Sequence, residues 1–283
     1  MKAGAFLVVL ALGACAAPDP APKVAPADPA HPRILSLNPC TDAILAEVAD
    51  RAQIVALSSY SRNPSESSMD VALAQSLPAT NGTVEEVLAL APDIILSGNL
   101  TPPAQRAAFA RLGLPLVEHA IPHTVDDSRA TIRRVAALAG HVDRGEALIA
   151  RINAALAKAA PPAGQLPVPA LVWQGGGMVP GPNTLIADLL AHTGFTSFSA
   201  ARGLGQSQIL PLERVLADPP AVILAAGHDG QDRLLAHPVL AGLPATQRFA
   251  FDPALEWCGG PTIIRAAARL AQIRQSLPRR PAT

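Results

Sequence analysis

The sequence is poor in aromatic side chains and has no strong charge bias. Only 3% of its 283 residues are aromatic, and the formal net charge is zero. No run of Lys and Arg stands out, which argues against a nucleic-acid partner, because such partners are held by clustered basic charge. With one Tyr and two Trp in the chain, each of these side chains needs a reason, either packing or ligand contact.

The chain also lacks the short motifs of common cofactor sites and hydrolases. Gly175-Gly176-Gly177 is followed by Pro180 and Pro182, so it begins neither a P-loop nor a dinucleotide-binding helix. We expect this loop to let a bulky ligand approach the backbone. No Gly-x-Ser-x-Gly elbow is present. An exported hydrolase-like α/β enzyme therefore has no specific support, and we predict no catalytic residue and no resident cofactor.

The N-terminus has the features of an export signal. Lys2 precedes an apolar stretch, 5–12, which is too short to span a bilayer. Leu12-Gly13-Ala14-Cys15 then resembles the bacterial lipoprotein box, in which the Cys is lipidated after cleavage. We expect residues 1–15 to act as a lipoprotein-type signal with the lipid on Cys15. Ordinary signal cleavage near Ala14 or Ala17 is the alternative, and either route exports the chain.

A Pro/Ala-rich segment, residues 16–32, follows the signal and contains six prolines. This composition favours extended polyproline II and no packed core. At about 3 Å per residue it would reach roughly 50 Å. Such a tether suits a globular body held near a membrane by a lipid.

Apart from Cys15 of the signal, the chain contains two cysteines, Cys40 and Cys258. In an oxidising compartment two such residues can form a disulfide, or they can stay as buried free thiols. The sequence leaves these alternatives open.

A fourteen-residue phrase occurs twice, as 83–96 (TVEEVLALAPDIIL) and 211–224 (PLERVLADPPAVIL), with seven identical positions. Each copy predicts a short helix, a proline stop and a buried strand. Because the copies are 128 positions apart, they indicate two similar lobes rather than a solenoid. Two such lobes would form a cleft between them.

Strands alternate with helices on both sides of one long helix, which predicts an α/β fold. Right-handed crossovers at this spacing give mostly parallel sheets. We expect two lobes, 33–140 and 163–275, joined by a connector helix at 141–162 and followed by a tail at 276–283. The predicted strands are 33–37, 54–57, 93–97, 115–118, 169–173, 222–226 and 248–251. The predicted helices are 41–49, capped by Thr41 or Asn38, and 84–90, 103–112, 125–139, 143–160, 183–192, 231–240 and 261–275.

Ligands of open α/β sheets bind beyond the carboxyl ends of the strands. Asn38, Tyr60, Arg62, Trp173 and Trp257 are placed at or just beyond predicted strand ends. We predict that they line the cleft, where the amphipathic aromatics suit a ring-bearing ligand and Arg62 suits an anionic group. Core packing is the alternative for the three aromatic residues.

Glu118, His119 and His123 also follow a strand end and offer possible metal ligands. Pro122 interrupts them and no further well-placed His or Cys is visible. We therefore expect solvent-facing loop histidines and no metal site.

Taken together, the segments resemble the periplasmic binding proteins for iron–siderophore complexes, haem and cobalamin, which serve ABC importers. The resemblance covers about residues 33–275 and rests on RILSLNPCTDAILAEV, both copies of the repeat, LGLPLVEH, the long helix and GPNTLIADLLAHTGF. It implies two lobes joined by a rigid helix, with a small-molecule metal chelate clamped between them. It also implies a periplasmic location, a permease and ATPase as partners, and a monomer. The lipid on Cys15 would anchor it to a membrane.

Glu85 and Glu213 occupy the same position of the two repeat copies. Each lies in the first turn of its predicted helix, where a carboxylate favours the helix dipole. In relatives, a glutamate on each lobe docks with arginines of the permease. The resemblance therefore implies a docking role for both residues.

The resemblance leaves the ligand open. Residues 56–64 (ALSSYSRNP) are similar to the cobalamin-binding branch, in which the matching tyrosine faces the corrinoid. Residues 79–82 and 203–208 lack the tryptophans of that branch. Cobalamin and an iron chelate, either siderophore or haem, both remain. Cys40 and Cys258, one per lobe, would face the cleft as a disulfide or as ligand contacts. A surface lipoprotein without transport function is a further alternative.

Overall fold

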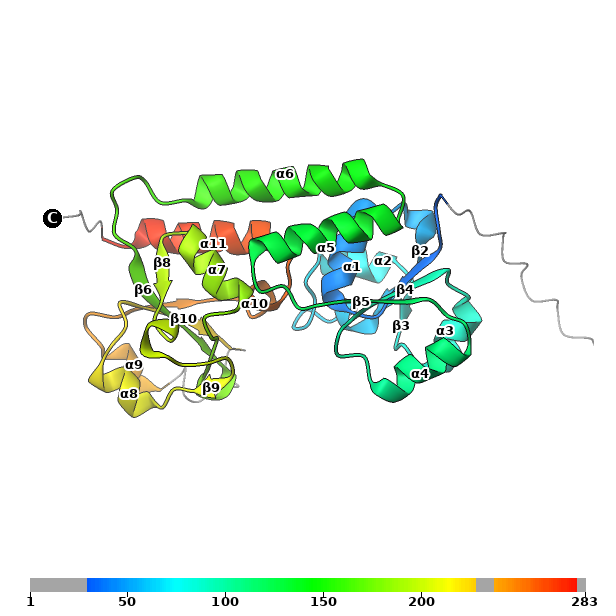
Figure 1. The fold of residues 1–283 in the computed structure, drawn as a ribbon. Helices are drawn as coiled ribbons and strands as arrows, with labels where there is room; N and C mark the ends of the chain where they lie inside the picture. The colour runs from blue at the N-terminus through cyan, green and yellow to red at the C-terminus, as the bar shows by residue number, and fades with distance from the viewer. Residues whose placement is uncertain (1–29, 228–236, 279–283) are drawn as a thin grey trace, which may run out of the picture.

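The computed structural model describes residues 30–227 and 237–278 and shows two α/β lobes beneath one long helix (Figure 1). The predicted signal with Cys15, residues 16–29 of the tether and part of the predicted helix 231–240 lie outside the described residues. No helix in the described ranges is long and apolar enough to cross a membrane. The predicted fold class is confirmed.

The N-terminal lobe is built on a five-stranded parallel sheet in the order β3-β2-β1-β4-β5. Its strands are β1 (Ile34–Ser36), β2 (Ile54–Ser58), β3 (Ala79–Thr80), β4 (Ile94–Gly98) and β5 (Leu116–His119). Its helices are α1 (Pro39–Val48), α2 (Val71–Ser76), α3 (Val84–Leu90), α4 (Pro103–Arg111) and α5 (Val125–Leu138).

The C-terminal lobe has a four-stranded parallel sheet in the order β11-β10-β6-β8. Its strands are β6 (Val168–Gln174), β8 (Phe195–Ser197), β10 (Val222–Ala226) and β11 (Gln247–Ala250), with an antiparallel pair of β7 (Met178–Val179) and β9 (Gln208–Ile209). Its helices are α7 (Leu185–His192), α8 (Leu212–Ala217), α9 (Pro238–Ala241), α10 (Ala254–Trp257) and α11 (Thr262–Ser276).

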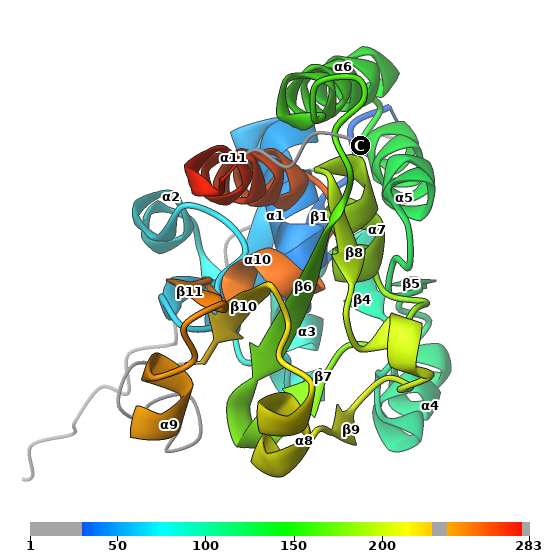
Figure 2. The same ribbon diagram turned by 90° about the vertical axis from the view of Figure 1, so that its left-hand side faces the viewer.

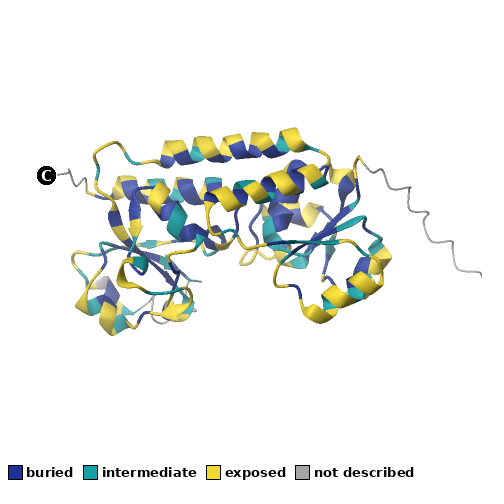
Figure 3. Ribbon diagram, viewed as in Figure 1, coloured by how far each residue is buried: buried dark blue, intermediate teal, exposed yellow. Residues whose placement is uncertain are grey.

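The connector is α6 (Val142–Ala159), close to the predicted 141–162. Leu148, Ile152 and Leu156 form its buried stripe, whereas its outer face is exposed (Figure 3). Together with α1, α5, α7 and α11 it forms a layer that covers one face of both sheets (Figure 2). Side chains from both lobes join one continuous core beneath this layer. The two lobes are therefore braced along one side.

The repeat places equivalent residues in equivalent environments. Val87 of α3 and Val215 of α8 are fully buried against the outer face of their sheets. Ile95 and Ile223 point to the same outer faces, and the leucine after each points to the shared core on the other side. This alternation is the period of a strand that is covered on both faces. The helices α3 and α8 lie on the side of the molecule away from α6 (Figure 1).

Candidate functional site

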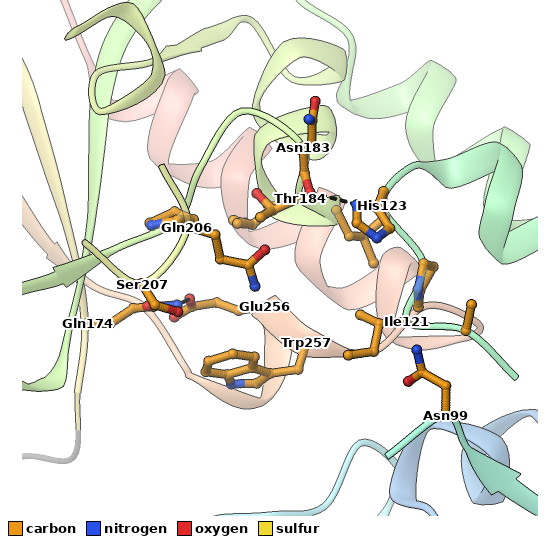
Figure 4. A pocket seen from close by; sticks show the side chains of 15 residues that line it. Asn99, Ile121, His123, Gln174, Asn183, Thr184, Gln206, Ser207, Glu256 and Trp257 are labelled. Carbon is orange, nitrogen blue, oxygen red and sulfur yellow. Dashed lines mark hydrogen bonds between the residues drawn. The ribbon is translucent and has the colours of Figure 1, made fainter. Parts of the chain in front are cut away.

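A cavity of ≈ 210 Å³ lies between the two lobes, at the carboxyl ends of their strands (Figure 4). The loops after β4 and β5 form its N-terminal wall, whereas β6, the start of α7, the loop before β9 and α10 form its C-terminal wall. The lining includes Asn99, Ile121, His123, Gln174, Asn183, Thr184, Gln206, Ser207, Glu256 and Trp257. This is the edge at which open α/β sheets bind ligands.

A smaller cavity of ≈ 50 Å³ adjoins the first and shares Ile121 and Pro122 with it. Asn38, Cys40 and His119 contribute to its walls. Asn38 caps α1, and its side-chain Oδ1 accepts a hydrogen bond from the Cys40 backbone N–H at 2.9 Å. The N-cap predicted from the sequence thus lies next to the space between the lobes.

Glu256 is a buried acid in the wall of the larger cavity. Its side chain is 5% exposed, and its Oε2 accepts a hydrogen bond from Gln174 Nε2 at 2.5 Å. Its Oε1 has no hydrogen-bond partner among the described residues. Burial, with a smaller contribution from Asp252, raises the pKa of Glu256 to about 8. Most of this carboxyl is therefore protonated at neutral pH.

A seam of covalent and polar contacts fixes the lobes beside the cavities. Cys40 at the start of α1 and Cys258 after α10 form a disulfide, so the pairing that the sequence left open is present. The side-chain oxygen of Ser128 in α5 accepts a hydrogen bond from the Gly260 backbone N–H at 2.7 Å. Asp188 of α7 accepts from the Val125 backbone N–H at 2.8 Å. Trp257 directly precedes Cys258 in the sequence.

The segment after the disulfide is threaded tightly between helices of the N-terminal lobe. A Cβ at Gly259 would lie 2.4 Å from Ser128 Oγ, and one at Gly260 would lie 2.6 Å from Ile44 Cγ1. Gly260 also has φ +65°, which disfavours other residues. These glycines let the backbone approach α1 and α5 closely enough for the seam to form.

Asp42 fixes the loop that carries Tyr60. It is fully buried, and its Oδ2 accepts hydrogen bonds from the Ser58 backbone N–H at 3.0 Å and from Ser61 Oγ at 2.6 Å. These two donors flank Tyr60 in the sequence. Burial raises the pKa of Asp42 to about 8, with its hydrogen bonds opposing the shift.

We predict that Asp42→Asn makes stability less dependent on pH. Between the ordinary pKa of 3.8 and the folded value of about 8, the folded state keeps a proton that the unfolded state has released. The contribution of Asp42 is therefore full below pH 3.8 and is lost as the pH rises through 8. Glu256 acts in the same direction. Burial lowers the pKa of His119 to about 4, so the unfolded state holds a proton that the folded state has lost. His119 therefore makes stability rise with pH, but only up to its ordinary pKa of 6.5.

Between pH 6.5 and pH 8, Asp42 and Glu256 are the acids among the described residues whose raised pKa makes stability fall as the pH rises. Urea unfolding in this window should show wild-type stability falling with pH, and the fall should be shallower in Asp42→Asn by at most about 1.4 kcal/mol per pH unit. The exposed Asp143→Asn on α6 is the control and should follow the wild type. Equal slopes in wild type and Asp42→Asn would show that Asp42 is ionised in the fold.

The predicted site residues separate into three groups. Trp257, 54% exposed, lines the larger cavity, and Asn38 lines the smaller one. Tyr60, 57% exposed, follows β2 at the same edge of its sheet but lies outside both linings. For Trp173 and Arg62 the predicted position in the cleft is wrong. Trp173 is fully buried in the C-terminal core, and Arg62 donates to the Leu77 carbonyl beside a separate surface hollow.

Two loop predictions also require correction. Gly175-Gly176-Gly177 forms a turn that does not line the cavity; instead Gly181 admits the backbone of Gln206, whose N would lie 2.5 Å from a Cβ there. His119 is not solvent-facing but 6% exposed, whereas His123 is exposed and its Nδ1 lies 2.8 Å from the Asn183 carbonyl oxygen.

Of the candidate metal ligands near the end of β5, Glu118 and His123 have other partners, whereas the buried His119 Nε2 has no hydrogen-bond partner among the described residues. Glu118 pairs with Arg106 at 2.9 Å, away from the two histidines. A different trio, His31, Asp50 and His141, has ligand atoms within 4.8 Å of one another. However, Asp50 pairs with Arg144 at 2.8 Å, and His141 Nε2 bonds Gln53 at 2.9 Å. These contacts explain the trio without a metal.

Most of the polar residues that line the larger cavity were not predicted from the sequence. Asn99 follows a strand end and Thr184 caps α7, so both positions carried a detectable signal. Gln206 and Ser207 lie in a loop without any pattern, and the close approach to Gly181 and the pairing of β9 with β7 bring them to the cavity.

Comparison with known proteins gives a consistent result. Residues 34–248 match the family described as periplasmic binding protein. The fold is similar to the periplasmic heme-binding protein RhuT from Roseiflexus sp. RS-1, with 25% identity, a TM-score of 0.66 and coverage of 86% of this chain and 96% of that one. A periplasmic heme-binding protein from Pseudomonas aeruginosa gives 20% identity, a TM-score of 0.70 and coverage of 89% and 95%. The vitamin B12 binding protein BtuF of Vibrio cholerae gives 17% identity, a TM-score of 0.63 and coverage of 87% of this chain and 99% of that one. A search of curated proteins by sequence finds no match.

Proposed function

Because the chain belongs to the family of periplasmic binding proteins for iron chelates, haem and cobalamin, we propose that it captures a metal-chelate nutrient and delivers it to an ABC permease. The observation that carries this proposal is the cavity between the lobes, at the carboxyl ends of both sheets. Binding proteins of this family are partners of importers rather than enzymes. Cobalamin, a ferric siderophore and haem are the candidate ligands.

Trp257 is the main ligand-contacting residue in this proposal. Trp257 is more than half exposed and, like Ile121, lines the cavity (Figure 4). A planar or ring-bearing chelate can stack on such a surface. Asn38 would contact the part of the ligand that enters the smaller cavity, and Tyr60 would act at the rim after β2.

The remaining parts of the proposal concern attachment and delivery. A lipid on Cys15 and the proline-rich tether would hold the body at a membrane. Glu85 and Glu213 are exposed on α3 and α8, and neither carboxylate has a partner among the described residues. By contrast, the neighbouring Glu86 accepts hydrogen bonds from Thr80 and Asn81. The two free carboxylates are available to basic residues of a permease.

A titration tests the proposal. The mature chain is titrated with cyanocobalamin, haemin and a ferric hydroxamate while the visible absorption bands of the chelate are followed. We expect a saturable shift with at least one of them. If none binds more tightly than about 10 μM, roughly −7 kcal/mol, the transport function loses its basis.

A further inference from the structure

We propose that the cavity selects an uncharged chelate that carries amide or hydroxyl groups at its edge, and that Glu256 contributes a hydrogen bond to such a ligand. This inference rests on the proposed function and narrows its ligand. Three features of the cavity support it: its lack of cations, its free amides and its buried acid.

No Lys or Arg from the described part of the chain lines either cavity. Carboxylate and phosphate groups are usually bound by Arg or Lys, whose N–H donors replace the lost hydration. An anionic group that entered this space would lose water without gaining a cation. Arg62, the cation expected from the sequence, bonds the Leu77 carbonyl instead.

The polar lining is instead rich in neutral groups. The side chains of Asn99, Asn183 and Gln206 line the larger cavity and have no hydrogen-bond partner among the described residues. Each primary amide offers two donor hydrogens and an acceptor oxygen, so it can pair with an amide or hydroxyl of a ligand. Ile121 and Trp257 supply apolar surface between these groups. The match is to an uncharged molecule with polar groups at its edge.

Glu256 adds a further neutral hydrogen-bonding group to the wall of the cavity. Gln174 satisfies one of its oxygens, and the other has no partner among the described residues, so this wall is stable with a protonated carboxyl. A protonated carboxyl donates a hydrogen bond to a ligand carbonyl, and ionisation removes this donor. Asp252 is the other acid that acts on Glu256, and His123 is the titratable group across the cavity.

Calorimetry with four probes tests the selectivity. Cyanocobalamin and ferrichrome have no net charge and are rich in amides, whereas haemin and ferric enterobactin are anionic. At pH 7 the better uncharged probe should bind at least about 100-fold more tightly than either anion. Haemin or ferric enterobactin binding as tightly as that probe would overturn the inference while supporting the transport function. Failure of all four at about 10 μM overturns both.

The pH profile tests the role of Glu256. With its pKa at about 8, affinity for the uncharged probe should fall about tenfold from pH 7 to pH 9 as the carboxyl ionises. Glu256→Gln should remove this fall, and the exposed control Glu213→Gln should retain it. A flat wild-type profile, or the same fall in Glu256→Gln, would overturn the role.

Discussion

Replacing Cys40 and Cys258 together with serine should lower the free energy of unfolding by about 4–5 kcal/mol, close to the upper end for a single bridge. The disulfide joins residues 218 positions apart and therefore closes most of the chain into one loop. In the loop-entropy account, a longer loop gives a larger gain because the unfolded chain is more restricted. Urea unfolding of the variant and the wild type measures the difference.

The same experiment contains its own controls. Either single serine variant should lose as much as the double variant, because each removes the whole bridge. Reduced wild-type protein should coincide with them. A double variant within about 1 kcal/mol of the wild type would show that the hydrogen bonds and packing of the seam hold the lobes without the disulfide.

Reversing the charge of both Glu85 and Glu213 to lysine should abolish uptake and leave chelate affinity intact. The residues belong to α3 and α8, helices on the side of the molecule away from α6, one on each lobe (Figure 1), and neither residue belongs to the cavity linings. In the proposed function, Glu85 and Glu213 contact the permease and not the ligand. Like charges facing basic residues there would oppose docking by several kcal/mol.

Uptake of the chelate by cells, together with its affinity for the purified protein, measures the two effects separately. Each single reversal should reduce uptake partially. Asp143→Lys, in the first turn of α6 at the opposite side, changes the net charge as much as either single reversal does and should leave uptake unchanged. Loss of affinity in the double variant would mean that the glutamates act on the fold or the cavity rather than on docking.

The parts of the fold that follow local rules could be predicted from the sequence. Asn38 caps α1 by accepting a hydrogen bond from the backbone N–H of Cys40, two residues away. The buried stripe of α6, Leu148, Ile152 and Leu156, has the helical period. The helix and strand predicted from each repeat copy are present because their signals, an apolar helical pattern, a proline and a buried strand, are all short-range. The short strands β3, β7 and β9, two residues each, carry too few positions to show a period.

The site was harder because strands covered on both faces do not reveal which face a residue takes. Leu171 and Trp173 point to the outer core of the C-terminal lobe, whereas Ala170 and Val172 point to the shared core. All four are apolar, so the sequence could not distinguish a buried Trp173 from one at the cleft. Arg62 was misplaced for a related reason: the turn after β2 decides its direction.

The pairing of the cysteines depended on a distance that no spacing reveals. Cys40 and Cys258 meet because the segment with Gly259 and Gly260 passes between α1 and α5. The same passage brings Glu256 and Trp257 to the cavity. The residues that matter most to the proposed ligand site are therefore set by tertiary contact rather than by local pattern.

The most direct test of the account is fluorescence during a chelate titration, because the two tryptophans differ completely in environment. Trp257 lines the cavity, and Trp173 is fully buried. With cyanocobalamin, haemin or ferrichrome, we predict saturable quenching at one equivalent and below about 10 μM, most of which disappears in Trp257→Phe. Tight binding with the same quenching in Trp257→Phe would contradict a ligand between the lobes.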